Sequence, residues 1–70
     1  MKKAKEQKKR ISVEQLKDER LEQNLSQAEL AKQAGIDRST LTCYELGLRK
    51  PPIDVLQKLA KALNVIIEIK

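Results

Sequence analysis

Apolar positions recur at helical spacing through the first half of this chain of 70 residues. Ser12 followed by Gln15 has the form of a capping box and predicts the start of a first helix. The same pattern at Ser26 and Glu29, with stronger apolar flanks, predicts a second helix over residues 27–34. Positions three and four apart share one face of a helix, so both segments would bury one side.

Glycine and proline mark the boundaries of two further helices. Gly35 suits the left-handed backbone that ends a helix, and Asp37 is a good N-cap for a third helix over residues 38–46. Two adjacent prolines then stiffen the connection, because each fixes its own φ and restricts the residue before it. Beyond them, an apolar stripe predicts a fourth helix that ends near Asn64.

The last six residues follow a different pattern. Residues 65–70 are rich in β-branched side chains and too few for another useful helix, so we expect a strand. The strand could fold back on the fourth helix, but pairing with the same strand of a second chain would satisfy its edges, and we favour this intermolecular ribbon. The predicted fold is therefore all-α, with four helices and one short strand. The residues expected to hold the dimer are Val65, Ile66, Ile67 and Ile69.

Charge is distributed unevenly along the chain. Six of its fifteen Lys and Arg residues lie in the first ten positions against one acidic residue, and the other sixty residues carry nine of each sign. We expect a basic flexible arm over residues 1–10, a folded domain over residues 11–64 and the strand over residues 65–70. The arm would add affinity for nucleic acid by following phosphates, although a solubilising tail is the simpler alternative. Its basic residues are Lys2, Lys3, Lys5, Lys8, Lys9 and Arg10.

The residue types that most catalysis and metal binding need are nearly absent. The chain has no His and a single Cys, which excludes metal clusters, disulfide frameworks and most pairs of nucleophile and base. We expect no enzymatic activity, no cofactor and no metal. No apolar run is long enough to span a membrane, and the first residues lack the apolar core of a secretory signal. We therefore expect a cytoplasmic, nucleoid-associated protein.

Residues 27–46 meet the packing requirements of two helices joined by a tight turn. Apolar residues supply the inner faces, Ala31 is the small residue where the helices cross, and Gly35 makes the turn. The outward positions of the third helix form one continuous face, because residues four apart lie side by side. These positions are Arg38, Ser39, Thr42 and Cys43.

This segment resembles the phage-repressor-like (Cro/C1, or XRE) helix-turn-helix family. The resemblance covers about residues 16–64 and rests on Leu25-Ser26-Gln27-Ala28-Glu29-Leu30-Ala31, Gly35-Ile36, Ser39-Thr40-Leu41, Glu45-x-Gly47 and Pro51. It implies a sequence-specific transcriptional regulator, a repressor in the simplest case, that binds double-stranded DNA. In this family the second helix of the motif reads base edges, while the start of the first helix and the loop after the second contact phosphates.

The resemblance assigns roles to individual residues. The base contacts would be Arg38, Ser39, Thr42 and Cys43. The phosphate contacts would be Ser26, Gln27, Arg49 and Lys50. Arg20 and Glu45 would form a structural pair. A homodimer of such a domain implies a palindromic operator with half-sites about one turn of DNA apart.

Several of these residues have plainer interpretations. Arg38 could bond a guanine with two hydrogen bonds or simply be solvated, and the hydroxyls of Ser39 and Thr42 could equally contact phosphates or water. Cys43 is better interpreted as a small hydrophobe that meets a thymine methyl group than as a redox switch.

Two departures from the family pattern stand out. Glu19 occupies a position that is usually apolar, and the C-terminal strand stands where many relatives have a fifth helix. A compact helix-turn-helix that ends in a strand also resembles the antitoxins of kinase-type toxin–antitoxin modules. In that alternative, the chain would bind and neutralise a toxin protein and also repress its own operon.

Overall fold

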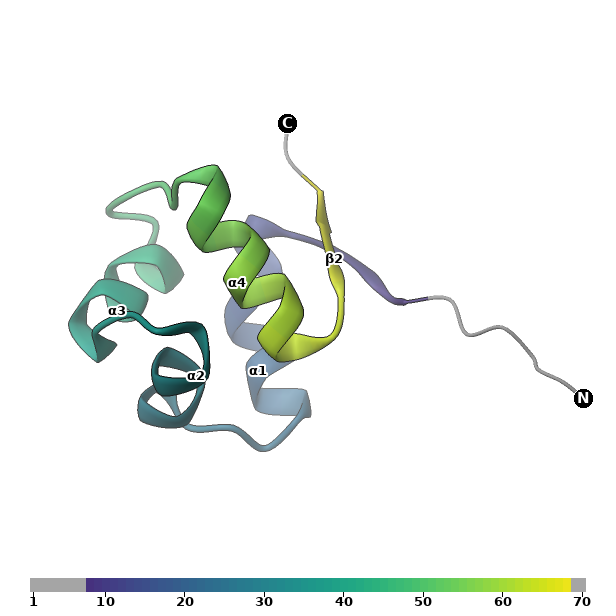
Figure 1. The fold of residues 1–70 in the computed structure, drawn as a ribbon, viewed down its shortest axis with the longest axis horizontal. Coiled ribbons are helices and arrows are strands. Elements are labelled where there is room, and N and C mark those ends of the chain that lie inside the picture. Colours follow the sequence, from purple (N-terminus) through teal and green to yellow (C-terminus); the bar gives the residue numbers. More distant parts are fainter. Residues whose placement is uncertain (1–7, 69–70) are drawn as a thin grey trace, which may run out of the picture.

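The computed structural model describes residues 8–68, which form four α-helices and two short strands (Figure 1). The elements in chain order are β1 (Arg10–Ser12), the 3₁₀ turn η1 (Val13–Gln15), α1 (Leu16–Glu22), α2 (Gln27–Ala34), α3 (Arg38–Leu46), α4 (Ile53–Leu63) and β2 (Ile66–Glu68). The predicted arrangement of four helices followed by a strand is confirmed. None of the described helices combines the length and apolarity needed to cross a membrane.

The caps of α2 are those that the sequence predicts. Ser26 Oγ accepts a hydrogen bond from Glu29 N at 3.0 Å, and Ser26 N donates to Glu29 Oε1 at 2.8 Å. At the other end, Gly35 has a φ of 71°, a left-handed conformation that is costly for residues with a Cβ atom. The first helix differs, because Ser12 and Gln15 bracket a 3₁₀ turn and α1 begins only at Leu16.

Every α-helix contributes a leucine to a single core. The fully buried side chains are Leu16, Leu30, Leu41, Leu59 and Leu63. Ala31, the small residue that the sequence places at the crossing of the second and third helices, is 2% exposed and belongs to the core. The helix-turn-helix is therefore held by α1 and α4 as well as by its own turn.

The C-terminal strand pairs within its own chain. β1 and β2 are parallel, with Ile11 opposite Ile67, and Ile66 N donates to Lys9 O at 2.9 Å. The sequence did not predict β1, because Arg10 continues the basic run of the arm and Ser12 has the pattern of a helix cap. One edge of β2 is thus hydrogen-bonded to β1 of the same chain. This edge therefore does not form the two-stranded ribbon between chains that the sequence favoured.

Two of the residues expected to hold a dimer instead hold β2 to its own domain. Val65 is buried in the core and Ile67 packs against it, whereas Ile66 is 40% exposed. Ile69 lies outside the described residues. Of the described residues in that set, Ile66 alone has an exposed apolar side chain that a second molecule could contact.

The N-terminal boundary of the folded domain lies earlier than predicted. Lys9 Nζ contacts Glu19 Oε1 at 2.9 Å and Glu22 Oε1 at 3.0 Å, and Arg10 Nη1 lies 3.4 Å from Glu68 Oε2. Lys9 and Arg10, which were predicted to belong to the arm, thus make contacts with the domain. Lys8 is exposed, and Lys2, Lys3 and Lys5 lie outside the described residues.

Candidate nucleic-acid interface

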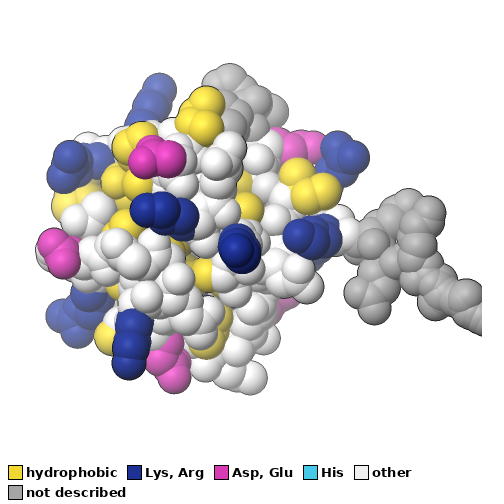
Figure 2. Space-filling model, in the orientation of Figure 1, with side chains coloured by type: hydrophobic (Ala, Val, Ile, Leu, Met, Phe, Trp, Pro, Cys, Tyr) yellow, Lys and Arg dark blue, Asp and Glu magenta, His cyan; other side chains and the backbone are white. Residues whose placement is uncertain are grey.

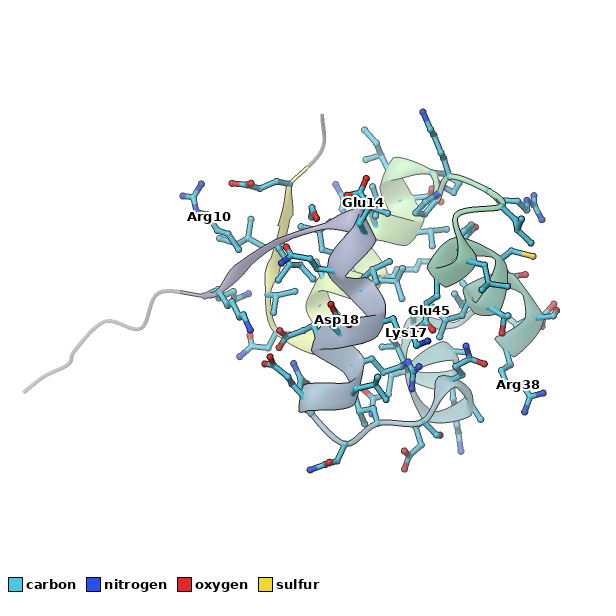
Figure 3. All side chains as sticks on the ribbon, turned by 180° about the vertical axis from the view of Figure 1, so that it is seen from behind. Arg10, Glu14, Lys17, Asp18, Arg38 and Glu45 are labelled. Carbon is cyan, nitrogen blue, oxygen red and sulfur yellow. The ribbon has the colours of Figure 1, made fainter. Side chains whose placement is uncertain are left out.

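The outer side of α3 begins with an exposed arginine. Arg38 and Ser39 form the start of the helix and are both exposed, and Figure 3 shows Arg38 pointing away from the body while Glu45 points inward. Within residues 8–68, Arg38 forms no ion pair. Its five guanidinium donors are therefore available to a ligand at the end of the helix.

Behind α3 lies a buried ion pair. Arg20 Nε donates to Glu45 Oε2 at 2.8 Å and Arg20 Nη2 donates to Glu45 Oε1 at 3.2 Å, with the two side chains 7% and 2% exposed. Arg20 Nη1 donates to the carbonyl of Leu25 at 2.8 Å. These are the two residues that the resemblance paired, and their bidentate geometry joins α1 to α3 and to the residues before α2.

Gln27 and Thr42 extend this ion pair into what we call the buried network: Arg20, Glu45, Gln27 and Thr42. Gln27 Nε2 donates to Glu45 Oε1 at 3.0 Å, and Thr42 Oγ1 donates to Gln27 Oε1 at 2.9 Å. The opposite amide orientation would set its oxygen against a carboxylate, so the network fixes this side chain. The first residue of α2 is thereby bonded to the middle of α3.

These contacts change the interpretation of two predicted site residues. The sequence placed Gln27 at a phosphate and Thr42 at a base, whereas both side chains are half-buried and bonded to each other. The Thr42 hydroxyl also lies 3.0 Å from Arg38 O, and its single hydrogen can serve only one of these acceptors at a time. The bond to Gln27 joins residues fifteen apart in the sequence, a separation that leaves no periodic signal.

The other predicted contacts surround the exposed end of α3. Ser26 is exposed, and its oxygen already accepts the bond from Glu29 N, so its hydroxyl hydrogen remains for another partner. Cys43 is a half-buried free thiol. Arg49 and Lys50 are exposed in the connection between α3 and α4, and like Arg38 they form no ion pair within residues 8–68. Three cations without counter-ions in the described structure therefore belong to α3 and the connection that follows it.

Glu19, the main departure from the family pattern, belongs to a second polar group. We call this the N-terminal cluster: Lys9, Glu19, Glu22 and Gln23. The hydrogen bond that Gln23 Nε2 donates to Glu19 Oε2 at 2.9 Å lowers the pKa of Glu19, the contact with Lys9 lowers it further, and burial opposes both. The hydrogen bonds of Lys9 to Glu19 and Glu22 raise the pKa of Lys9. A buried carboxylate is accommodated here because the N-terminal segment supplies its counter-ion.

Comparison with known proteins places this geometry among DNA-binding regulators. The helix-turn-helix family model HTH_3 matches residues 16–68. An uncharacterized HTH-type transcriptional regulator of Mycobacterium tuberculosis is 39% identical over 54 residues, covering 77% of this chain and 39% of that protein. The cryptic phage CTXphi transcriptional repressor RstR of Vibrio cholerae is 36% identical over 50 residues, covering 71% of this chain and 45% of that protein. The chain thus spans less than half the length of these relatives.

Solved structures share the fold. The restriction-modification controller protein C.AhdI from Aeromonas hydrophila superposes with a TM-score of 0.73 at 36% identity, covering 76% of this chain and 80% of that one. A chain of the SinR protein/SinI protein complex gives a TM-score of 0.72 at 34% identity, covering 77% of this chain and 53% of that one.

Proposed function

The chain belongs to the helix-turn-helix family of DNA-binding transcriptional regulators, and from this premise we propose that it is a repressor that binds a palindromic operator as a homodimer. The buried network carries the proposal. It bonds α3 to α1 and α2 through buried and half-buried side chains, while the first turn of α3 projects free side chains. A helix held in this way can enter the major groove without first having to be ordered.

Arg38 is the principal base reader in this proposal. It stands at the exposed start of α3, where its fork of donors can bond the O6 and N7 atoms of a guanine. Ser39 offers a hydroxyl beside it. Thr42 and Cys43 contribute apolar contact, since a methyl group and a thiol both suit the methyl group of thymine, while the Thr42 hydroxyl stays on Gln27.

Phosphate contacts on either side of the groove would set the register of α3. Arg49 and Lys50 lie in the connection after α3, and Ser26 and Gln27 lie at the start of α2, where free backbone N–H groups favour anions. Gln27 Nε2 uses one hydrogen on Glu45 and keeps a second. In this proposal, Gln27 serves the network and a phosphate together.

Selection from a random pool of DNA duplexes tests the proposal. We expect the wild type to select a palindrome whose half-sites lie about one helical turn, roughly 34 Å, apart. Arg38→Ala should lose the preference at one position in each half-site, whereas Lys50→Ala should weaken all sequences equally and reduce the salt slope by about 1. The matched control is Lys17→Ala, which removes an exposed charge on α1. It should change neither the selected sequence nor the salt dependence of the affinity.

Two results would contradict the proposal. One is the absence of any selected motif for the folded wild type. The other is an Arg38→Ala variant that selects the same motif with the same affinity, since it would remove the base-reading role from α3.

The antitoxin alternative has less support. It rested on a C-terminal strand whose edges are open to a second chain, whereas β2 has a partner on one edge in its own domain. Co-purification of a toxin encoded in the adjacent reading frame would be the observation in its favour.

A further inference from the structure

The outer side of α4 and β2 carries an apolar groove that the DNA interface does not use. The groove has a volume of about 410 Å³, and its floor and walls include Leu56, Ala60, Ile53 and Ile66. The last two are large hydrophobic side chains that are 59% and 40% exposed. Figure 1 shows α3 and β2 on opposite sides of α4, and Figure 2 shows exposed hydrophobic groups among basic ones on this face. A ligand in this groove would leave α3 accessible.

One flank of α4 is charged in a self-complementary way. Asp54 and Lys61 are seven residues apart, which is two turns, so they lie on the same side of the helix near its opposite ends. Both are exposed, and neither forms an ion pair within residues 8–68. The exposed Lys58 lies between them along the helix, four residues after Asp54 and three before Lys61. The apolar residues are arranged in the same way, because Ile53 begins α4 and Ile66 follows its end.

We propose that a second copy of this chain occupies the groove, with the two α4 helices packed antiparallel about a two-fold axis. This arrangement deepens the proposed function, because it names the surface through which the operator-binding dimer forms. The axis reverses the helix direction and keeps the same flanks together, so Asp54 of each copy faces Lys61 of the other. Ile53 likewise meets Ile66 of the other copy. A parallel arrangement would instead bring like charges to the same level along the pair.

The basic rim of the groove favours this occupant. The charged residues that line it are Lys8 and Lys61, both positive, so an occupant that places a carboxylate opposite one of them is favoured. Asp54 of a second copy supplies it opposite Lys61. In this arrangement Ile66 keeps the role in dimerisation that the sequence predicted. Its side chain would pack against α4 of the other copy, and its backbone would not form a ribbon between chains.

Charge reversal tests this geometry. We expect Asp54→Lys and Lys61→Asp, each alone, to weaken the dimer roughly 10- to 100-fold, because the two-fold axis turns two attractive pairs into two repulsive ones. The double variant Asp54→Lys/Lys61→Asp should restore the dimer to within a few-fold of the wild type. The measurement is sedimentation velocity over a series of concentrations, with the melting temperature of each variant measured alongside. Ile53→Ser should weaken the dimer without any change of charge.

The controls separate this surface from general electrostatics. Lys17→Asp and Asp18→Lys make the same charge changes at exposed positions on α1, outside the groove, and should leave the dimer intact. The proposal is overturned if the single reversals leave the dimer unchanged, or if the double variant is folded but fails to restore it. A folded wild type that remains monomeric at all concentrations also overturns it, and binding of an acidic peptide would then identify the occupant.

DNA binding distinguishes this inference from the proposed function. A monomeric Asp54→Lys variant should keep its sequence preference on a single half-site and lose only the added affinity for the palindrome. If the wild type shows no sequence preference, the proposed function fails, whatever the oligomeric state. If the charge-reversal variants keep both the sequence preference and the dimer, the proposed function stands and only the assignment of the dimer interface to α4 fails.

Discussion

Two polar groups hold opposite parts of this domain with similar residue types and very different exposure. In the buried network, the side chains of Arg20 and Glu45 are 7% and 2% exposed. In the N-terminal cluster, Lys9 and Glu22 are 53% and 64% exposed, and only Glu19 is buried. Water screens the charges of the N-terminal cluster but not those of the buried network. Ion pairs with nearly equal N–O distances should therefore contribute differently to the free energy of unfolding.

The difference in exposure matches a difference in task. The buried network connects α1, α2 and α3, so its loss would change how α3 is held against the other two helices. The N-terminal cluster fastens the start of β1 to α1, on the side of the domain away from α3 (Figure 1). A loss there should loosen the sheet and leave DNA reading unchanged.

Breaking the buried ion pair should have the largest effect. Arg20→Met leaves Glu45 buried without its counter-ion, and we expect the free energy of unfolding to fall by about 3–5 kcal/mol. Urea denaturation measures this loss. The matched control is the double variant Arg20→Met/Glu45→Leu, which removes both charges and should recover most of the stability. A loss below about 1 kcal/mol for the single variant would show that water reaches Glu45.

The N-terminal region should depend on apolar burial more than on its charges. Ile11 in β1 is 2% exposed, and Ile11→Ala should cost about 2–4 kcal/mol through lost burial and a cavity. Lys9→Met, which removes the exposed charge of the cluster, should have a much smaller effect in the same urea titration. Equal losses for the two variants would contradict this ranking and give the ion pairs the principal role in holding β1.

The hydroxyl of Thr42 tests whether the buried network reaches the DNA surface. Thr42→Val keeps the shape and removes the bond to Gln27, so we expect a loss of about 1 kcal/mol in stability. The preferred operator should stay the same, because in the proposed complex the hydroxyl does not contact a base. Selection from a random duplex pool checks this, with Ser39→Ala as the matched loss of an exposed hydroxyl. A changed motif for Thr42→Val with unchanged stability would return Thr42 to the set of base readers.

Local signals predicted one side of the molecule better than the other. The caps of α2, the glycine turn and the burial of the small Ala31 follow from patterns within a few positions, and all are visible in the sequence. The pairing of β1 with β2 joins residues more than fifty positions apart in the sequence. The three residues of β1 are too few for a periodic pattern that would predict a strand. The boundary of the basic arm was misplaced for the same reason, because Lys9 is held by a backbone bond from Ile66 and by acids on α1.

The candidate site shows the same division. The exposure of Arg38 and Ser39 followed from helical periodicity, since their inward neighbours are apolar. The inward engagement of Gln27 and Thr42 could not be predicted that way, because a half-buried polar side chain is placed by partners on another helix. The unusual Glu19 was noticed as a departure, but its explanation needed the counter-ion that β1 brings.

The smallest expected effect is a dependence on pH confined to the N-terminal cluster. The pKa of Glu19 lies below its ordinary value of 4.5 in the folded chain, chiefly through the bond from Gln23. Its contribution is therefore fully present above about pH 4.5 and lost as the pH falls through the folded-state value. Lys9 has the opposite sign: its pKa is raised above 10.5, so its contribution is lost only as the pH rises beyond that value.

Glu19→Gln isolates this effect. We expect the variant to be less stable than the wild type at pH 7 by on the order of 1 kcal/mol, since it loses the charge that strengthens the bond from Gln23. The two proteins should converge as the pH is lowered below 4.5, which urea midpoints across pH 3–7 would measure. The matched control is Glu14→Gln, which removes an exposed carboxylate without an ion pair in the described structure. A stability difference for Glu19→Gln that stays constant down to pH 3 would show that the charge of Glu19 does not contribute to stability. The buried network and the N-terminal cluster would then differ in burial alone.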